Sequence, residues 1–241
     1  MSRVVLVTGG SRGIGYGIAK CFAACGDTVI INAREDTATL AKAVDELKLA
    51  GGNAHGFVAD LADYEKAREL YRNIKAAHGP VGVLVNNAGT AHYGLFTDMQ
   101  LCDIQGVLAN NLHATLNVSH LAVPDMVRAK SGCIINITSV WGITGASCEV
   151  VYSTAKAAVI GFTKALAKEL GPSGIRVNAI ACGAFDTRMN AQLSQEEKNA
   201  FAEDIPLGRF GYPGEAGALA VYMASAEYLT GQVVPLDGGL V

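Results

Sequence analysis

Seven short runs of apolar, largely β-branched residues recur along the sequence, and they constrain the fold more than any other feature. They lie at 4–8, 28–33, 56–59, 81–86, 133–138, 175–181 and 232–236. Short, continuously apolar runs are typical of strands buried on both faces. Amphipathic stretches separate most of them, such as 40–52, in which Gly51 is in a stop position, and 64–79, which ends at Gly79 before Pro80. This alternation predicts a doubly wound α/β fold, a parallel sheet of about seven strands with helices on both faces.

One domain is expected to span residues 1–241. An α/β chain of this length can bury a large core as one unit, and no linker or repeat divides it. Half of the residues are hydrophobic and 17% are charged, which excludes a disordered chain. The net charge of −3 and the absence of a long basic run argue against nucleic acid as the main partner.

The sequence contains no apolar stretch near the roughly 20 residues that a membrane helix requires. The chain enters its first apolar run, RVVLVT, without a secretory signal pattern, so a cytoplasmic protein is expected. Six cysteines are present without a Cys-x-x-Cys pair, and Cys21 and Cys25 have the spacing of one helix face. Reduced thiols are therefore expected rather than disulfides or a metal site.

The glycine-rich segment TGGSRGIG, residues 8–15, follows the first predicted strand and precedes an apolar helix. In a doubly wound sheet, ligands bind beyond the carboxyl ends of the strands. A glycine turn at that position lets the backbone approach a pyrophosphate, and the helix N-terminus presents free N–H groups to it. An ordinary tight turn is the alternative. The position favours dinucleotide binding, although the spacing of Gly9, Gly13 and Gly15 departs from the G-x-G-x-x-G form.

Five further segments follow the glycine turn in order: ADL at 59–61, NNAG at 86–89, ITSV at 137–140, YSTAK at 152–156 and TGQVVPLDGG at 230–239. Over essentially its whole length, the chain resembles the short-chain dehydrogenase/reductase family. Within that family it is most similar to reductases of 3-oxoacyl groups on acyl carrier protein and to related carbonyl reductases. The resemblance implies a Rossmann-type fold and an NAD(P)-dependent oxidoreductase acting on CH–OH groups.

Tyr152 and Lys156 are four residues apart, a spacing that places both on one helix face. A carbonyl that receives a hydride needs a proton, and a tyrosine of ordinary pKa is a poor shuttle at neutral pH. We expect the ammonium of Lys156 to lower the pKa of Tyr152, which would act as acid in reduction and base in oxidation. Lys156 can also hydrogen-bond the nicotinamide ribose. Ser139 is expected to polarise the substrate oxygen, although alone it would suggest only a strand-ending hydroxyl.

The resemblance implies a fourth catalytic residue, an asparagine in the helix before Ser139. We choose Asn111, which lies 28 residues before Ser139 and precedes a leucine, and expect Asn110 to be structural. Asn111 would help to hold the lysine and a proton-relay water. Asn87 is expected both to stabilise the turn after its strand and to contact the adenosine ribose. Gly89 would let the chain pass close to the cofactor.

The cofactor preference is predicted from charge after the second strand. NAD-preferring folds place an acidic residue there, whereas a 2′-phosphate requires positive charge. Ala33 occupies the acidic position, and Arg34 and Arg12 lie nearby, so NADP, as NADPH, is predicted over NAD. Two solvated surface arginines are the alternative, and Glu35 and Asp36 complicate the local charge.

The resemblance implies further cofactor contacts. Asp60, with Leu61 beside it, is expected at the adenine amino group, and Thr187 at the nicotinamide carboxamide. Cys182 replaces the proline that usually precedes Gly183, which removes the rigidity of a fixed φ. No metal is expected, and the predicted cofactor site comprises Gly9, Ser11, Arg12, Gly13, Ile14, Gly15, Arg34, Asp60, Leu61, Asn87, Gly89, Tyr152, Lys156, Gly183, Phe185 and Thr187.

Three functions remain open from the sequence. The first is NADPH-dependent reduction of a 3-oxoacyl thioester in fatty acid biosynthesis, the second is turnover of a small ketone, sugar or steroid, and the third is a non-catalytic NADP-sensing scaffold. The intact catalytic set disfavours the third. Residues 186–207 are polar and resemble a mobile substrate lid. A basic patch beside the cleft would meet an acyl carrier protein, and Arg128 and Lys130 match part of it, whereas Ser173 stands where another basic residue is common.

The helix that carries Tyr152 predicts an assembly. It carries more small and apolar surface than packing against one face of the sheet requires. The residues concerned are Ala157, Ala158, Ile160, Gly161, Ala165 and Leu166. The resemblance implies that this helix and the one near 100–130 pair between copies in a homotetramer. The C-terminal segment VVPLDGGLV would form a second contact. A monomer whose alanines only permit close packing is the alternative.

Overall fold

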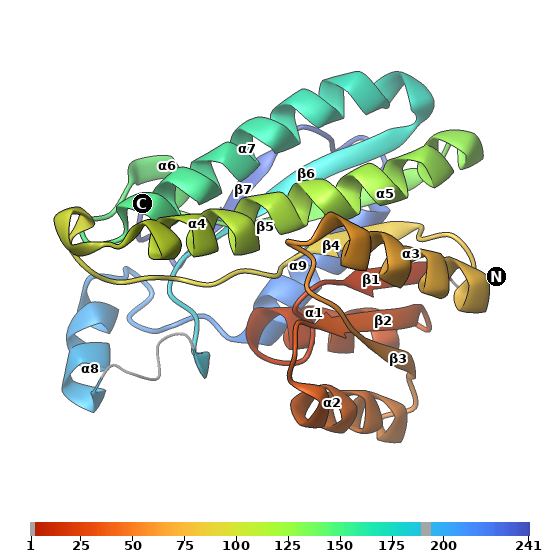
Figure 1. Cartoon of the computed structure of the whole chain (residues 1–241). Coiled ribbons are helices and arrows are strands. Elements are labelled where there is room, and N and C mark those ends of the chain that lie inside the picture. Colours follow the sequence, from red (N-terminus) through yellow and green to blue (C-terminus); the bar gives the residue numbers. More distant parts are fainter. Residues whose placement is uncertain (1–2, 189–193) are drawn as a thin grey trace.

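The computed structural model describes residues 3–188 and 194–241. In that part of the chain, seven parallel strands form one sheet in the order β3-β2-β1-β4-β5-β6-β7 (Figure 1). The order reverses between β1 and β4, which is the doubly wound topology predicted from the alternating sequence pattern. The strands are β1 Val4–Val7, β2 Thr28–Ala33, β3 Asn53–Val58, β4 Val83–Asn86, β5 Gly132–Ser139, β6 Ile175–Cys182 and β7 Val233–Leu236.

All seven predicted strands are present, but β3 begins at Asn53 rather than at residue 56. Its first residue pairs with Thr28 of β2, so hydrogen bonding extends the strand beyond its apolar run. β3 lies at the edge of the sheet, and its residues alternate between more and less exposed, with Ala54 buried. An edge strand with one solvent-exposed face does not require a continuous apolar run. The apolar pattern therefore predicted a strand that begins three residues too late.

Helices cover both faces of the sheet. Val5 and Val7 of β1 pack toward one layer of helices, α1, α2 and α9, whereas Leu6 packs toward the opposite layer, α3, α5 and α7. Figure 1 shows these layers below and above the strands. The helices are α1 Gly13–Ala24, α2 Thr37–Leu49, α3 Tyr64–His78, α4 Leu101–Leu108, α5 Ala114–Ala129, α6 Trp141–Thr144, α7 Val150–Leu170, α8 Gln195–Glu203 and α9 Pro213–Ser225.

Helix ends follow local chemistry. Asp36 caps α2 by accepting a hydrogen bond from the backbone N–H of Thr39 at 3.0 Å. Gly51 and Gly79 follow α2 and α3 with φ of +88° and +90°, a conformation that favours glycine after a helix. The stops predicted at these glycines are therefore confirmed.

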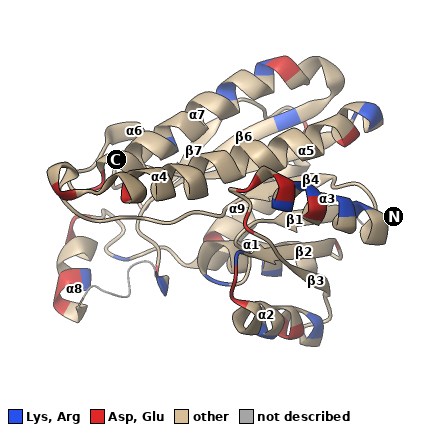
Figure 2. Ribbon diagram, viewed as in Figure 1, with Lys and Arg blue, Asp and Glu red and all other residues tan. Residues whose placement is uncertain are grey.

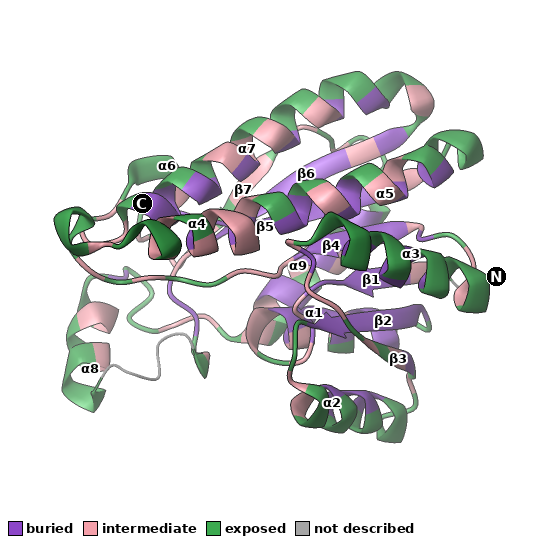
Figure 3. Ribbon diagram, viewed as in Figure 1, coloured by how far each residue is buried: buried purple, intermediate pink, exposed green. Residues whose placement is uncertain are grey.

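The segment predicted as a substrate lid, 186–207, includes residues 189–193, which lie outside the described residues. Helix α8 occupies part of the remainder and begins with a capping box between Ser194 and Glu197. None of its residues is buried, and Figure 3 shows it set apart from the sheet with exposed and intermediate residues only. Its role as a lid stays a prediction.

Across the two described ranges, no helix combines the length and the apolar character needed to span a bilayer.

Candidate active site

A cleft of about 790 Å³ lies beyond the carboxyl ends of the strands on the β1 side of the sheet. Loops that follow β1, β2, β3, β4 and β6 contribute its walls. This is the position at which a doubly wound sheet binds its ligands. The predicted cofactor residues that line it are Gly9, Ser11, Arg12, Gly13, Ile14, Arg34, Asp60, Leu61, Asn87, Gly89 and Thr187.

The glycine turn is shaped by backbone constraints and by β4. Gly9 and Gly13 have φ of +61° and +56°. A Cβ on Gly15 would lie 2.4 Å from the side-chain nitrogen of Asn87, so that glycine permits the close approach. The same Asn87 nitrogen donates to the carbonyls of Thr8 and Gly9 at 2.9 and 3.1 Å. Asn87 was predicted to stabilise the turn after its own strand, whereas these hydrogen bonds fix the glycine turn after β1, ahead of the α1 N-terminus.

Arg34 and Arg12 both line the cleft, and each has a carboxylate nearby. Arg34 donates to Oδ1 of Asn110 at 3.1 Å and lies 3.3 Å from the Glu35 carboxylate. Arg12 lies 3.8 Å from the carboxylate of Asp36. Asn110 lines the cleft and orients Arg34, a part that the sequence did not indicate. This end of the cleft presents guanidinium groups held by, and partly offset by, neighbouring carboxylates.

Tyr152, Lys156 and Ser139 meet where β5 ends against α7. Tyr152 is 9% exposed and Lys156 5% exposed. The ammonium nitrogen of Lys156 donates to the carbonyl of Ile137 at 3.1 Å, and it lies 5.6 Å from the centre of the Tyr152 ring. The hydroxyl of Ser139 accepts a hydrogen bond from the backbone N–H of Trp141 at 3.1 Å. The spacing on α7 therefore brings the predicted tyrosine and lysine together beside the predicted serine.

Asn111 lies in a π-helical turn, Ala109–His113, between α4 and α5. Its side-chain nitrogen donates to the carbonyls of Thr90 at 2.7 Å and Val107 at 2.9 Å. Its Oδ1 is buried and finds no hydrogen-bond partner within the described residues. A Cβ on Gly89 would lie 2.4 Å from that oxygen and 3.4 Å from the Lys156 nitrogen. The missing side chain of Gly89 leaves space between them that suits a bridging water.

The expected direction of the Tyr152 pKa is wrong. Burial raises the pKa of Tyr152, the Glu149 carboxylate and Cys182 raise it further, and hydrogen bonding to Ser139 lowers it. Burial also lowers the pKa of Lys156 to about 8. Desolvation disfavours the charged form of both groups, and the Lys156 ammonium points to the Ile137 carbonyl. The phenol is therefore held in its protonated form at neutral pH.

Five of the predicted cofactor residues do not line the cleft, namely Tyr152 and Lys156, which meet at the end of β5, and Gly15, Gly183 and Phe185. Gly15 lies beneath Asn87, and a Cβ on Gly183 would lie 2.6 Å from Cβ of Asp237. Phe185 is buried in the hydrophobic core against the α1, α2 and α9 layer. Its backbone pairs with Gly211, and a Cβ on Gly211 would lie 3.0 Å from the Phe185 ring. Among the residues predicted after β6, Thr187 is the one that reaches the cleft.

Cys182 ends β6 opposite Ser139 of β5. Burial raises the pKa of its thiol to about 12, and the neighbouring Lys156 opposes this shift. Its carbonyl accepts from the N–H of Val140 at 3.0 Å, and the N–H of Gly183 donates to Leu236 at 3.0 Å. Two backbone hydrogen bonds thus hold this turn without a proline.

Arg128 and Lys130, which were expected to form part of a basic patch beside the cleft, do not lie beside it. Arg128 and Lys130 lie at the C-terminal end of α5, just before β5 begins at Gly132. Ser139 lies at the other end of β5, so the length of the strand separates them. Arg128 also pairs with the carboxylate of Asp125. Figure 2 shows these charges at the end of α5 away from α6 and the first turn of α7.

Comparisons with known proteins agree with this arrangement. Residues 3–198 match the family model described as short chain dehydrogenase. The chain is 42% identical to the 3-oxoacyl-[acyl-carrier-protein] reductase FabG of Aquifex aeolicus over 99% of its own length and 97% of the relative. It is 39% identical to the uncharacterized oxidoreductase YmfI of Bacillus subtilis over 99% of both chains.

A solved structure shows the same fold. The crystal structure of a candidate gluconate dehydrogenase from Agrobacterium tumefaciens matches with a TM-score of 0.95 and 30% identity, over 99% of this chain and 95% of that one. Sequence and structure thus give the same assignment across the whole length of the chain. The chain belongs to the short-chain dehydrogenase/reductase family and is an NAD(P)-dependent oxidoreductase acting on CH–OH groups.

Proposed function

We propose that the protein reduces a 3-oxoacyl thioester with NADPH. The observation that carries the proposal is the convergence of Ser139, Tyr152 and Lys156 at the end of β5, beside a cleft with two arginines at its other end. The substrate class is supported by the full-length similarity to a 3-oxoacyl-[acyl-carrier-protein] reductase. Such an activity would belong to cytoplasmic fatty acid biosynthesis with acyl carrier protein as a partner.

The cleft residues fit an NADP dinucleotide. The glycine turn lets phosphates approach the backbone at the N-terminus of α1, whose first turn contains no acidic residue. Arg12 and Arg34 offer charge to a 2′-phosphate at the end of β2, where Ala33 leaves the acidic position empty. When bound, NADPH supplies the hydride that adds to the carbonyl carbon.

The protein side of the reaction is a proton transfer. Tyr152 donates its phenolic proton to the substrate oxygen as negative charge develops there, and the C=O group becomes CH–OH. Ser139 donates a hydrogen bond to the same oxygen. The charged Lys156 stabilises the phenolate that remains, and the free oxygen of Asn111 can hold a water that returns the proton.

The test is a panel of carbonyl substrates with NADPH or NADH. The proposal predicts that acetoacetyl thioesters are reduced with a higher kcat/KM than simple ketones and sugars, and that NADPH is preferred. Turnover of ketones or sugars without thioester reduction would show that the substrate is a small ketone or sugar and not a 3-oxoacyl thioester. Cofactor binding without turnover of any carbonyl would favour the scaffold alternative.

Oxidation of a small sugar acid is the second candidate. It is favoured by the match to a candidate gluconate dehydrogenase over nearly the whole chain. The same tyrosine, as phenolate, would then accept the proton of the alcohol. Production of NADPH or NADH from gluconate, at a kcat/KM exceeding that for thioester reduction, would support this candidate instead.

The two reaction directions are expected to differ in pH dependence. Reduction needs protonated Tyr152, whose pKa is raised by burial, and charged Lys156, whose pKa is lowered by burial to about 8. Lys156 carries its charge below that pH and loses it above. Initial rates of reduction should therefore fall as pH rises through about 8, whereas oxidation, which needs the phenolate, should have a more alkaline optimum. A reduction rate that increases with pH through this range would contradict the assignment.

We also propose a homotetramer. Ala157, Gly161 and Ala165 form an exposed small-residue stripe on α7, and Leu101 of α4 and Leu116 of α5 are exposed apolar side chains. Apolar surface of this kind supports packing against a second copy. Light scattering at micromolar concentration should give the mass of four 25.0 kDa chains. A monomer mass would overturn the proposal, and a dimer would restrict it to one interface.

A further inference from the structure

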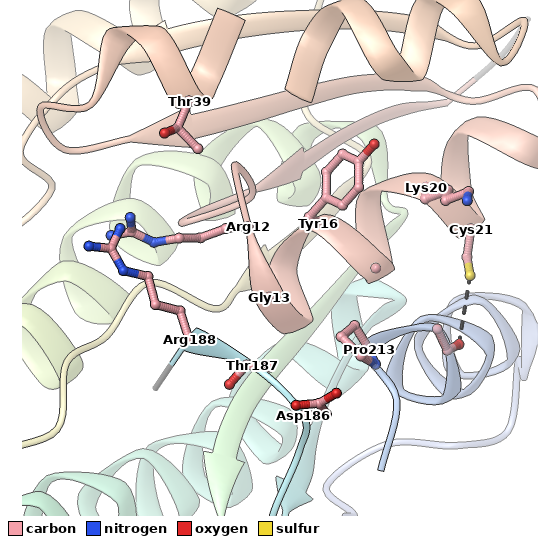
Figure 4. Close-up of a pocket in the computed structure, with 12 residues that line it drawn as sticks. Arg12, Gly13, Tyr16, Lys20, Cys21, Thr39, Asp186, Thr187, Arg188 and Pro213 are labelled. Carbon is pink, nitrogen blue, oxygen red and sulfur yellow. Dashed lines mark hydrogen bonds between the residues drawn. The ribbon is translucent and has the colours of Figure 1, made fainter. Parts of the chain in front are cut away.

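Arg188 is a cationic residue of the cleft that the sequence argument did not use. It follows Thr187 in the loop after β6, far from the glycine turn in sequence. In the view of Figure 4, its guanidinium group overlaps that of Arg12. Both residues line the cofactor cleft and also an adjoining pocket of about 640 Å³ next to α1. Two loops thus bring two positive charges to one place.

Both arginines interact electrostatically with the carboxylate of Asp36. It lies 3.8 Å from Arg12, and both arginines contribute to lowering its pKa, although the hydrogen bond from Thr39 lowers it more. Asp36 is anchored because it caps α2. One fixed negative charge therefore faces two guanidinium groups, and a guanidinium offers five N–H donors. The pair keeps both net positive charge and donors for a further anion.

The position of Asp36 indicates whether the two arginines lie near the 2′-phosphate or near the pyrophosphate of the cofactor. It follows the end of β2, where doubly wound folds hold the adenosine ribose hydroxyls. A pyrophosphate would instead lie over the N-terminus of α1. Arg34, just before Asp36, lines the same part of the cleft. The three arginines therefore line the end of the cleft at which a 2′-phosphate is expected.

We infer that Arg188 joins Arg12 and Arg34 as a third arginine for the 2′-phosphate of NADP and is a determinant of NADP over NAD. This inference rests on the proposed use of NADPH. It assigns a specificity function to the residue directly after Thr187, so that one loop serves both the nicotinamide end and the adenosine end of the cofactor.

The test is the variant Arg188→Gln, with dissociation constants for NADPH and NADH measured by fluorescence titration at fixed salt. Loss of one charge-assisted contact should raise the dissociation constant for NADPH about tenfold and leave that for NADH unchanged. Lys20→Gln is the matched control. Lys20 lines the adjoining pocket, carries the same charge and lies apart from the arginine pair in Figure 4, so this variant should bind both cofactors as the wild type does.

Each other outcome has a distinct meaning. If Arg188→Gln weakens NADPH and NADH equally, the arginine serves the pyrophosphate and the inference is overturned. If it weakens neither while the wild type prefers NADPH, the inference fails and the proposed function stands. If the wild type itself prefers NADH, the proposed use of NADPH is wrong, and the inference about Arg188 is wrong as well.

Discussion

Replacement of Tyr152 by phenylalanine is expected to lower kcat for carbonyl reduction by about 10²–10⁴-fold, the range for loss of a positioned general acid. The ring is buried and its packing is retained by phenylalanine, so the change removes the proton donor and little else. The dissociation constant for NADPH should stay nearly unchanged. Pre-steady-state and steady-state NADPH oxidation, together with a binding titration, measure both quantities.

Tyr71→Phe is a matched control for this variant. Tyr71 is also buried, and its hydroxyl donates to Asp125 on α5 at 3.0 Å, away from the cleft. Its loss should reduce stability by about 1 kcal/mol or more while kcat is retained. Turnover by Tyr152→Phe at the wild-type rate would reject Tyr152 as the acid.

Replacement of Lys156 should damage both turnover and cofactor binding. Lys156→Ala removes the ammonium, and Lys156→Met removes it while the buried stem keeps most of its volume. We expect an increase of about tenfold in the NADPH dissociation constant from the lost ribose contact, and a decrease of about 10²-fold or more in kcat from the lost charge. The fall of the reduction rate near pH 8 should also disappear in Lys156→Met, because the group that titrates there is gone.

Lys164→Met, on the exposed face of the same helix, controls for the loss of a lysine from α7. It should leave kcat, the NADPH dissociation constant and the pH profile unaltered. A Lys156→Met enzyme with normal cofactor affinity and a normal pH profile would be incompatible with the two roles given to Lys156.

The strands could be predicted because the central ones are buried on both faces, which leaves a continuous apolar run in the sequence. β3 was predicted less well because it is an edge strand whose pairing with β2 extends beyond its apolar residues. Tyr152 and Lys156 could be paired because their spacing matches one helical turn. Within a helix, sequence separation fixes proximity.

Other features of the site depend on contacts between distant segments. The raised pKa of Tyr152 follows from burial where α7 packs against β5 and α4, which spacing on one helix does not reveal. Asn110 contacts Arg34 from another element, and Arg188, in the loop after β6, lines the same pocket as Arg12. The ring of Phe185 is buried among residues of α1, α2 and α9, which are distant in sequence, so its position relative to the cleft was not evident from the sequence.

The stoichiometry of NADPH oxidation with an acetoacetyl thioester, followed together with formation of the 3-hydroxyacyl product, is the decisive measurement. We expect one product molecule for each NADPH consumed by the wild-type protein, and at least about 100-fold slower consumption by Tyr152→Phe at equal cofactor occupancy. NADPH that binds the wild type but is not consumed with this thioester would contradict the proposed reaction, and equal rates for the two proteins would contradict its mechanism.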